Sequence, residues 1–182
     1  MKTKDMILVA LFAALTAVGA FIRIPLGVST ITLQLLFTAL AGVLLGARLG
    51  LLSQAVYVLL GLVGLPIFAS GGGFAYLLHP TFGFLLGLLP TAYIIGRLTE
   101  RDGSPGRVAL ACLAGFAALY LVGVPYMGVI CNVYLGRGMT LWQILKAGML
   151  IYLPGDGLKI AVCALLAPQL ARALARAGSV GA

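Results

Sequence analysis

Long apolar stretches dominate this chain, and short stretches rich in polar residues, glycine or proline interrupt them. A run of about 20 apolar residues crosses a bilayer as a helix. The pattern predicts an all-α integral membrane protein, and the last of its helices is long and interrupted near Pro154. We expect six transmembrane helices, at residues 6–22, 31–46, 50–64, 81–98, 108–124 and 141–171.

The connections between these expected helices differ in character. Residues 65–80, LPIFASGGGFAYLLHP, are too rich in glycine and proline to form a plain helix. Residues 123–140 are expected to be broken by Pro125 and several glycines, so the fifth helix is predicted to end near residue 124 or a little beyond. The remaining connections are predicted as loops or turns at 23–30, 48–50 and 99–107.

The composition supports a membrane protein. Of the 182 residues, 62% are hydrophobic and 9% are charged, whereas a soluble domain has roughly a quarter of its residues charged. Residues 1–182 are therefore expected to form a single transmembrane domain. The formal charge of +8 does not indicate a nucleic-acid partner, because most basic residues lie at the ends of apolar stretches, where they act as topology signals.

Lysine and arginine are distributed unevenly between the two sides of the expected bundle. Cytoplasmic loops of membrane proteins carry an excess of these residues. If the N-terminus is cytoplasmic, Arg23 and Arg137 lie outside, and the inner side holds Lys2, Lys4, Arg48, Arg97, Arg101, Arg107, Arg172 and Arg176. We therefore expect both termini to be cytoplasmic. Residues 23–30, 65–80 and 125–140 are then all external.

Two charges lie inside the last apolar stretch, in the sequence YLPGDGLKIAV (152–162). Each charge at the centre of a membrane helix costs on the order of 3 kcal/mol. Asp156 and Lys159 are spaced i, i+3, so they share one helix face near mid-membrane. Pro154 and Gly157 loosen the helix around them. The pair is either part of a substrate site or a self-neutralising ion pair, and the flanking proline and glycine favour the site.

The external stretch 65–80 contains SGGG at residues 70–73, and consecutive glycines let the backbone approach a ligand closely. The stretch matches no phosphate-binding motif and is interpreted as a lid or re-entrant turn. With one histidine, His79, and poorly spaced cysteines, no metal site is expected. An intramembrane hydrolase using Ser70 and His79 is an alternative, although no nucleophile-turn motif surrounds Ser70.

The first helix contains ALFAALTA (10–17), in which Ala10 and Ala14, and likewise Ala13 and Ala17, are spaced i, i+4. Small residues at this spacing let helices pack closely in lipid. The spacing fits internal packing and docking onto another membrane subunit equally well. The chain has no nucleotide-binding loop, so uphill transport would draw energy from a partner or an ion gradient.

Four motifs together closely resemble the BioY family, the biotin-binding S components of energy-coupling factor (ECF) vitamin transporters. They are ITLQLL (31–36), LAGVLLGARLGLLSQAVYVLLGLVGLPIFASGGG (40–73), PTFGFLLG (80–87) and DGLK (156–159). The resemblance implies a cell-membrane protein with six transmembrane helices and an outward-facing biotin pocket. It implies no cofactor, since biotin is the transported ligand. The implied partners are a transmembrane coupling subunit and two ABC ATPases, and Ala10, Ala13, Ala14 and Ala17 then become a docking surface.

The resemblance also implies roles for residues of the pocket. Asp156 would accept from a ureido N–H of biotin, and Lys159 would donate to the carboxylate or to the ureido oxygen. The 65–80 segment would close over the vitamin. The other residues expected to contact or cover biotin are Gln34, Tyr152, Phe68, Ser70, Gly71, Gly72, Gly73, Phe74, Tyr76 and His79.

The chain departs from the family pattern at His79 and Phe82, where small residues are expected, and at Phe84, where a tyrosine is expected. These differences affect the expected lid contacts. Two alternatives to biotin capture stay open: an S component for another small vitamin, and the hydrolase described above. A vitamin without N–H donors would leave Asp156 without a role.

Overall fold

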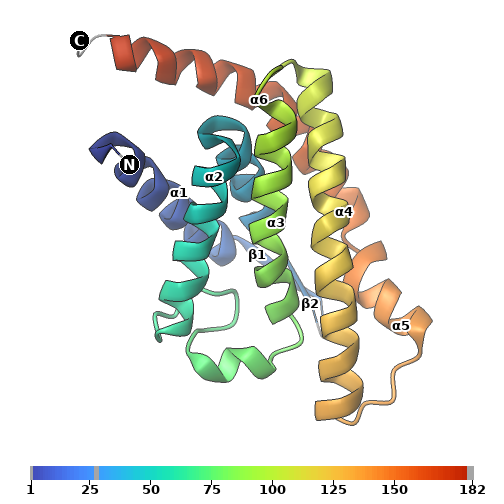
Figure 1. Cartoon of the computed structure of the whole chain (residues 1–182). Helices are drawn as coiled ribbons and strands as arrows, with labels where there is room; N and C mark the ends of the chain where they lie inside the picture. Colours follow the sequence, from blue (N-terminus) through green and yellow to red (C-terminus); the bar gives the residue numbers. More distant parts are fainter. Residues whose placement is uncertain (1, 27–28, 180–182) are drawn as a thin grey trace.

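The computed structural model describes residues 2–26 and 29–179, so residues 27–28 of the expected 23–30 loop lie outside the description (Figure 1). A short 3-10 helix covers Phe74–Leu78, and π-helical turns cover Ile130–Tyr134 and Lys146–Leu150. The main elements are α1 (Thr3–Phe21), β1 (Arg23–Leu26), β2 (Ser29–Thr32), α2 (Gln34–Leu62), α3 (Phe82–Thr99), α4 (Pro105–Val129), α5 (Leu141–Leu145) and α6 (Leu153–Ser179).

Helices long and apolar enough to cross a membrane make up most of the chain. Within the described residues there are five of them, at Thr3–Phe21, Gln34–Leu62, Phe82–Thr99, Pro105–Tyr134 and Leu141–Leu174. The prediction of an all-α protein built from such helices is confirmed. One small sheet is added to it: β1 and β2 form an antiparallel hairpin in which Arg23 pairs with Thr32. The sequence predicted a loop at 23–30 and a helix from residue 31, whereas α2 begins at Gln34.

Helix α2 is folded back on itself at Gly46, which explains why five apolar stretches stand where six helices were expected. Gly46 has a φ of +79°, a backbone conformation that favours glycine. The Thr38 hydroxyl lies 2.9 Å from Oε1 of Gln54, although sixteen residues of straight helix would separate them by about 24 Å. The two arms of α2 correspond to the helices expected at 31–46 and 50–64, with the turn slightly earlier than residues 48–50.

Helix α4 continues through Pro125 to Val129, so the prediction of a break at this proline is wrong. Close packing against α3 holds this part of α4 in place. A Cβ added at Gly83 would lie 2.3 Å from Cβ of Tyr126, the residue after the proline. In membrane bundles, neighbouring helices often compensate for the hydrogen bond that proline removes.

The last apolar stretch is interrupted where it was expected to be. Helix α5 runs into the π-helical turn 146–150, and α6 begins at Leu153, next to Pro154. A proline in the first helical turn loses no hydrogen bond, because the first four N–H groups have no partner within the helix. The break places Asp156 in the first turn of α6.

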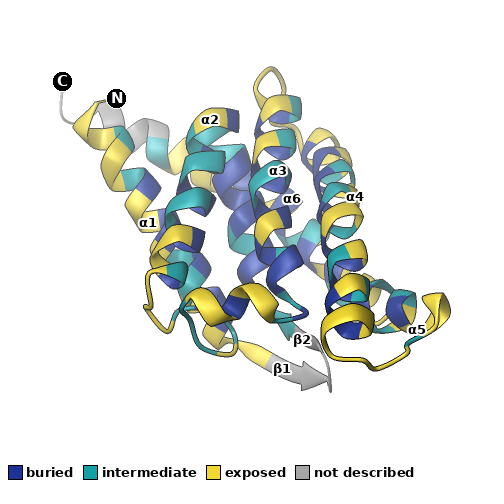
Figure 2. Ribbon diagram, turned by 60° about the horizontal axis from the view of Figure 1, so that its bottom comes forward, coloured by how far each residue is buried: buried dark blue, intermediate teal, exposed yellow. Residues whose placement is uncertain are grey.

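The connections gather at two opposite ends of the bundle. The start of α1, the Gly46 turn of α2 and the end of α6 lie at one end, with the connection between α3 and α4 (Figure 1). The β-hairpin, residues 65–80 and the connection from α4 to α5 lie at the other end, which Figure 2 brings forward. The described parts of the loops that were expected to share one side therefore lie at the same end of the molecule.

Candidate functional site

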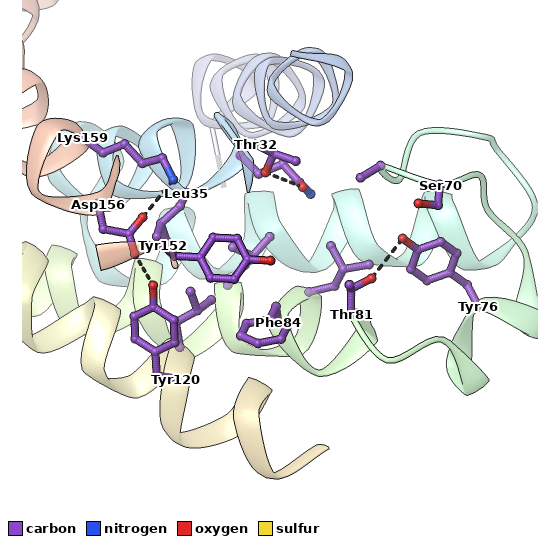
Figure 3. A pocket seen from close by; sticks show the side chains of 15 residues that line it. Thr32, Leu35, Ser70, Tyr76, Thr81, Phe84, Tyr120, Tyr152, Asp156 and Lys159 are labelled. Atoms are coloured by element: carbon purple, nitrogen blue, oxygen red, sulfur yellow. Dashed lines mark hydrogen bonds and ion pairs between the residues drawn. The ribbon is translucent and has the colours of Figure 1, made fainter. Parts of the chain in front are cut away.

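A cavity opens among α2, α3, α4 and α6 beneath the 65–80 segment. About 680 Å³ of space between atoms lies within it, and this volume includes space that is open to solvent. Figure 3 shows its lining, which has charged groups at one end and a group of hydroxyls at the other, with apolar side chains, Thr32 and Tyr152 between them. The lining residues are Thr32, Gln34, Leu35, Ala69, Ser70, Tyr76, Thr81, Phe84, Leu85, Leu88, Leu119, Tyr120, Tyr152, Asp156 and Lys159.

The charged end is built on the first two turns of α6. Nζ of Lys159 lies 2.9 Å from Oδ1 of Asp156, and the two residues are 7% and 4% exposed. The other carboxylate oxygen, Oδ2, accepts a hydrogen bond from the Tyr120 hydroxyl of α4. The positive end of the helix dipole lies at the start of α6 and favours a carboxylate at position 156. The paired charges are buried and partnered, as burial of charge requires.

The hydroxyl end lies under the 65–80 segment, away from Asp156 (Figure 3). The Tyr76 and Thr81 hydroxyl oxygens are 3.2 Å apart, and Nδ1 of His79 lies 2.7 Å from the Thr81 hydroxyl. Ser70 lies beside this group. Hydroxyl groups both donate and accept hydrogen bonds. This end can therefore bind a polar group of either kind.

Gln34 lines the cavity from the start of α2. Its Oε1 accepts from the Thr32 hydroxyl over 2.9 Å, and its Nε2 donates to the Tyr57 hydroxyl over 2.7 Å. Tyr152 comes from the turn before α6, and its ring crosses the middle of the cavity (Figure 3). Both side chains were expected at the site from the sequence, and both belong to its wall.

Several residues expected to touch the ligand lie behind the lining instead. Phe68 is 1% exposed and packs against Tyr57 and Tyr76, with ring centroids 5.6 and 4.8 Å away. His79 stacks on Tyr76 at a centroid distance of 4.7 Å. Burial, and then the charge of Arg137, lower the pKa of His79 below 6.5. Three further expected contacts, Gly71, Gly72 and Gly73, shape the segment without lining the cavity.

Phe74, expected to supply apolar cover, is 71% exposed and does not reach the cavity. Phe84, one of the departures from the family pattern, does line it, and its ring packs 6.4 Å from the rings of Tyr120 and Tyr152. Phe82, another departure, is buried against Tyr126. The aromatic cover of the cavity thus comes from α3 and Tyr76 more than from the glycine-rich turn.

Comparison with known proteins gives the chain a family. The sequence profile of the BioY family matches residues 1–176. The chain belongs to the BioY family. A probable biotin transporter BioY of Lysinibacillus sphaericus is 43% identical over 171 residues, covering 93% of this chain and 87% of that protein. The biotin transporter BioY of Thermotoga maritima is 36% identical, with 92% and 95% covered.

A solved structure shares the fold of this BioY-family chain. The crystal structure of the S component for biotin from an ECF-type ABC transporter superposes with a TM-score of 0.82 at 25% identity. The match covers 94% of this chain and 95% of that one. The chain is therefore a multi-pass membrane protein with the S-component fold, and it belongs to a family of transporters rather than enzymes.

Sequence reasoning missed three hydroxyl residues of the cavity in this BioY-family chain. Tyr120 holds Asp156 from α4, while Thr32 and Thr81 lie at the two helix starts that border the cavity. A tyrosine within an apolar span is a usable signal, because a buried hydroxyl group needs a hydrogen-bond partner. Nothing local in the sequence connects Tyr120 with a carboxylate 36 positions away.

The alanines expected to form one docking surface fall on two different faces of α1. Ala10 and Ala14 are exposed. Ala13 is 5% exposed and belongs to the core, and Ala17 packs against the core. The assignment of Ala13 to an outer surface is therefore wrong. Residues three or four positions apart share a helix face, as Ala10 and Ala14 do, whereas neighbouring residues such as Ala13 and Ala14 do not.

Proposed function

We propose that this chain binds biotin with high affinity and takes it up across the cell membrane as the capture subunit of an ECF-type ABC transporter. The relatives named as biotin transporters and the similarity to the S component for biotin support this proposal. The order of groups along the cavity is the observation that carries it. A charged end with Asp156 and Lys159 and a hydroxyl end with Ser70, Tyr76 and Thr81 lie apart, and the space between them is lined by apolar side chains together with Thr32 and Tyr152 (Figure 3).

Biotin carries its own groups in a matching order. Its ureido ring has two N–H donors and a carbonyl oxygen, an apolar bicycle follows, and a valerate tail ends in a carboxylate. The ureido ring is placed at the charged end, where Asp156 accepts from an N–H and Lys159 donates to the carbonyl oxygen. The ligand carboxylate is placed at the hydroxyl end beside Ser70 and Thr81, because two carboxylates side by side repel each other.

The proposed topology has six transmembrane helices and cytoplasmic termini. The fold-back of α2 at Gly46 supplies two of the six crossings. The uneven distribution of Lys and Arg supports the orientation, and so does the position of the start of α1 and the end of α6 at one end of the bundle (Figure 1). The cavity then opens toward the outside of the cell.

The proposed partners are a transmembrane coupling subunit and two ABC ATPases. The exposed small residues Ala10 and Ala14 of α1 are the proposed docking surface, because small side chains let two helix backbones approach closely in lipid. The energy for uptake comes from these partners, since the chain contains no nucleotide-binding loop.

Equilibrium binding of biotin to the purified protein in detergent tests the proposal. We expect saturable binding with one site per chain, and competition by analogues that keep the ureido ring. Vitamins without adjacent N–H donors are expected not to compete. Failure of a folded protein to bind biotin would overturn the assignment, and binding of another vitamin in its place would identify the S component's true ligand.

A further inference from the structure

One polar side chain of the cavity wall is held from behind by a residue that the cavity does not reach. Gln34 is 7% exposed and lines the cavity. Tyr57, on the second arm of α2, is fully buried and is absent from the lining. Nε2 of Gln34 and the Tyr57 hydroxyl oxygen are 2.7 Å apart. Tyr57 can therefore influence a ligand only through other residues.

The second partner of the Tyr57 hydroxyl decides the direction of this bond. The hydroxyl lies 3.0 Å from the main-chain carbonyl oxygen of Ile67, in the 65–80 segment. A carbonyl oxygen only accepts, so the tyrosine proton is committed to Ile67 and the tyrosine oxygen is left to accept. Gln34 must then present its NH₂ group to Tyr57.

The opposite orientation of the Gln34 amide is disfavoured for the same reason. A flipped amide would turn Oε1 toward Tyr57, and one tyrosine proton would face two acceptors, Oε1 and the carbonyl of Ile67. One buried acceptor would be left without a donor. In the orientation present, Oε1 accepts from the Thr32 hydroxyl over 2.9 Å, so both ends of the amide have matched partners.

We propose that Tyr57 is a positioning residue for ligand recognition, acting by fixing the orientation of the Gln34 amide. The second N–H of Nε2 and the second lone pair of Oε1 then have fixed positions from which they can bind the ligand. A site with fixed donors and acceptors rejects a ligand that leaves them unpaired. This inference rests on the proposed function, because biotin is the ligand used to test it.

A double-mutant cycle in purified protein separates this role from a general structural one. The Kd for biotin is measured for the parent, Tyr57→Phe, Gln34→Ala and the double variant. We expect Tyr57→Phe to weaken biotin binding on the order of tenfold in the parent, as for loss of a buried hydrogen bond. In the Gln34→Ala background the same change is expected to weaken binding less than about twofold, because coupled residues are not additive.

Tyr126→Phe is the matched control. The Tyr126 hydroxyl also donates to a main-chain carbonyl of the 65–80 segment, that of Leu77, and it is not among the hydrogen-bond partners of Gln34 in the described part of the chain. Its removal reports the cost of loosening the segment by itself. We expect whatever effect it has on the Kd to be the same with and without Gln34.

An equal effect of Tyr57→Phe in both backgrounds would overturn the proposal, and would place the action of Tyr57 in its bond to Ile67. Parent-like binding by Tyr57→Phe would overturn it as well. Thermal unfolding in detergent is followed for each variant. If Tyr57→Phe does not fold, the cycle uses Thr32→Val, which removes the donor to Oε1. Because Thr32 also lines the cavity, the criterion is then the difference between its effects on the Kd with and without Gln34, and equal effects would overturn the proposal that a fixed amide orientation matters. A parent that binds no biotin would instead refute the proposed function.

Discussion

Replacement of Asp156 by asparagine tests the charged end of the cavity directly. The change keeps the size of the side chain and one carboxyl-like oxygen, but it removes the negative charge that faces Lys159 at 2.9 Å. The remaining Lys159 is 7% exposed and forms no other salt bridge among the described residues. A buried cation without its partner is strongly unfavourable.

The structure sets the expected size of two separate effects. Removal of one partner from a buried ion pair costs about 3–5 kcal/mol of folding free energy, and the retained amide dipole places Asp156→Asn near the lower limit. Loss of a hydrogen bond from a charged acceptor to a ureido N–H costs about 2 kcal/mol of binding free energy. The second figure corresponds to biotin affinity weaker by roughly 30-fold.

Calorimetric titration with biotin and thermal unfolding in detergent measure the two effects on the same samples. Glu100→Gln is the matched control, because it breaks the Arg97–Glu100 pair, which has the same i, i+3 spacing but lies at the surface. We expect the control to change neither measurement. A second variant, Asp156→Asn with Lys159→Met, is expected to regain thermal stability without regaining affinity.

Biotin binding by folded Asp156→Asn within about threefold of the parent would refute this reasoning, since the charged hydrogen bond is assigned about 2 kcal/mol. Recovery of affinity in the double variant would refute it too. Either result would return Asp156 and Lys159 to the role of an ion pair that stabilises α6 and leaves recognition to the hydroxyl end.

Three further perturbations test other parts of the molecule. Ala14→Trp is expected to abolish co-purification with the coupling subunit while biotin binding is kept, and Ala161→Trp, on the exposed face of α6, is expected to leave both intact. Gly61→Ala would place Cβ 2.1 Å from the ring of Phe68, so we expect a lower unfolding temperature and weaker biotin binding. The pKa of His79 is lowered by burial, so the unfolded chain binds the proton more readily. The free energy of unfolding is therefore expected to fall as pH drops below about 6.5, and to fall less in His79→Gln. If His79→Gln loses stability with pH as steeply as the parent does, the assignment of this pH dependence to His79 is wrong.

Features that depend on neighbours in the chain were predictable from the sequence. The apolar stretches predicted the helices, since a membrane-spanning chain must satisfy its hydrogen bonds within each segment. The i, i+3 spacing predicted that Asp156 and Lys159 meet, because helix geometry alone brings such residues together. The interruption near Pro154 followed from the missing N–H of proline.

Boundaries that depend on packing were less predictable. The turn of α2 lies at Gly46 and not at residues 48–50, because the arms pack at Gly42 and Gly50, where a Cβ on Gly50 would lie 3.1 Å from Cα of Gly42. Pro125 does not end α4, because the contact of Tyr126 with Gly83 keeps the helix against α3. Both outcomes are set by a neighbouring helix, which the local sequence does not describe.

By itself, the sequence determined the membrane class, the helical segments, the excess of basic residues on one side and the buried pair on α6. Only the tertiary structure decided that Tyr120 holds Asp156, that Tyr57 holds Gln34, and that Ala13 is buried in the core whereas Ala14 is exposed. The physical reason is the range of the interactions. Hydrophobicity and helical periodicity act within one segment, whereas a hydrogen bond between helices depends on how their faces are turned toward each other.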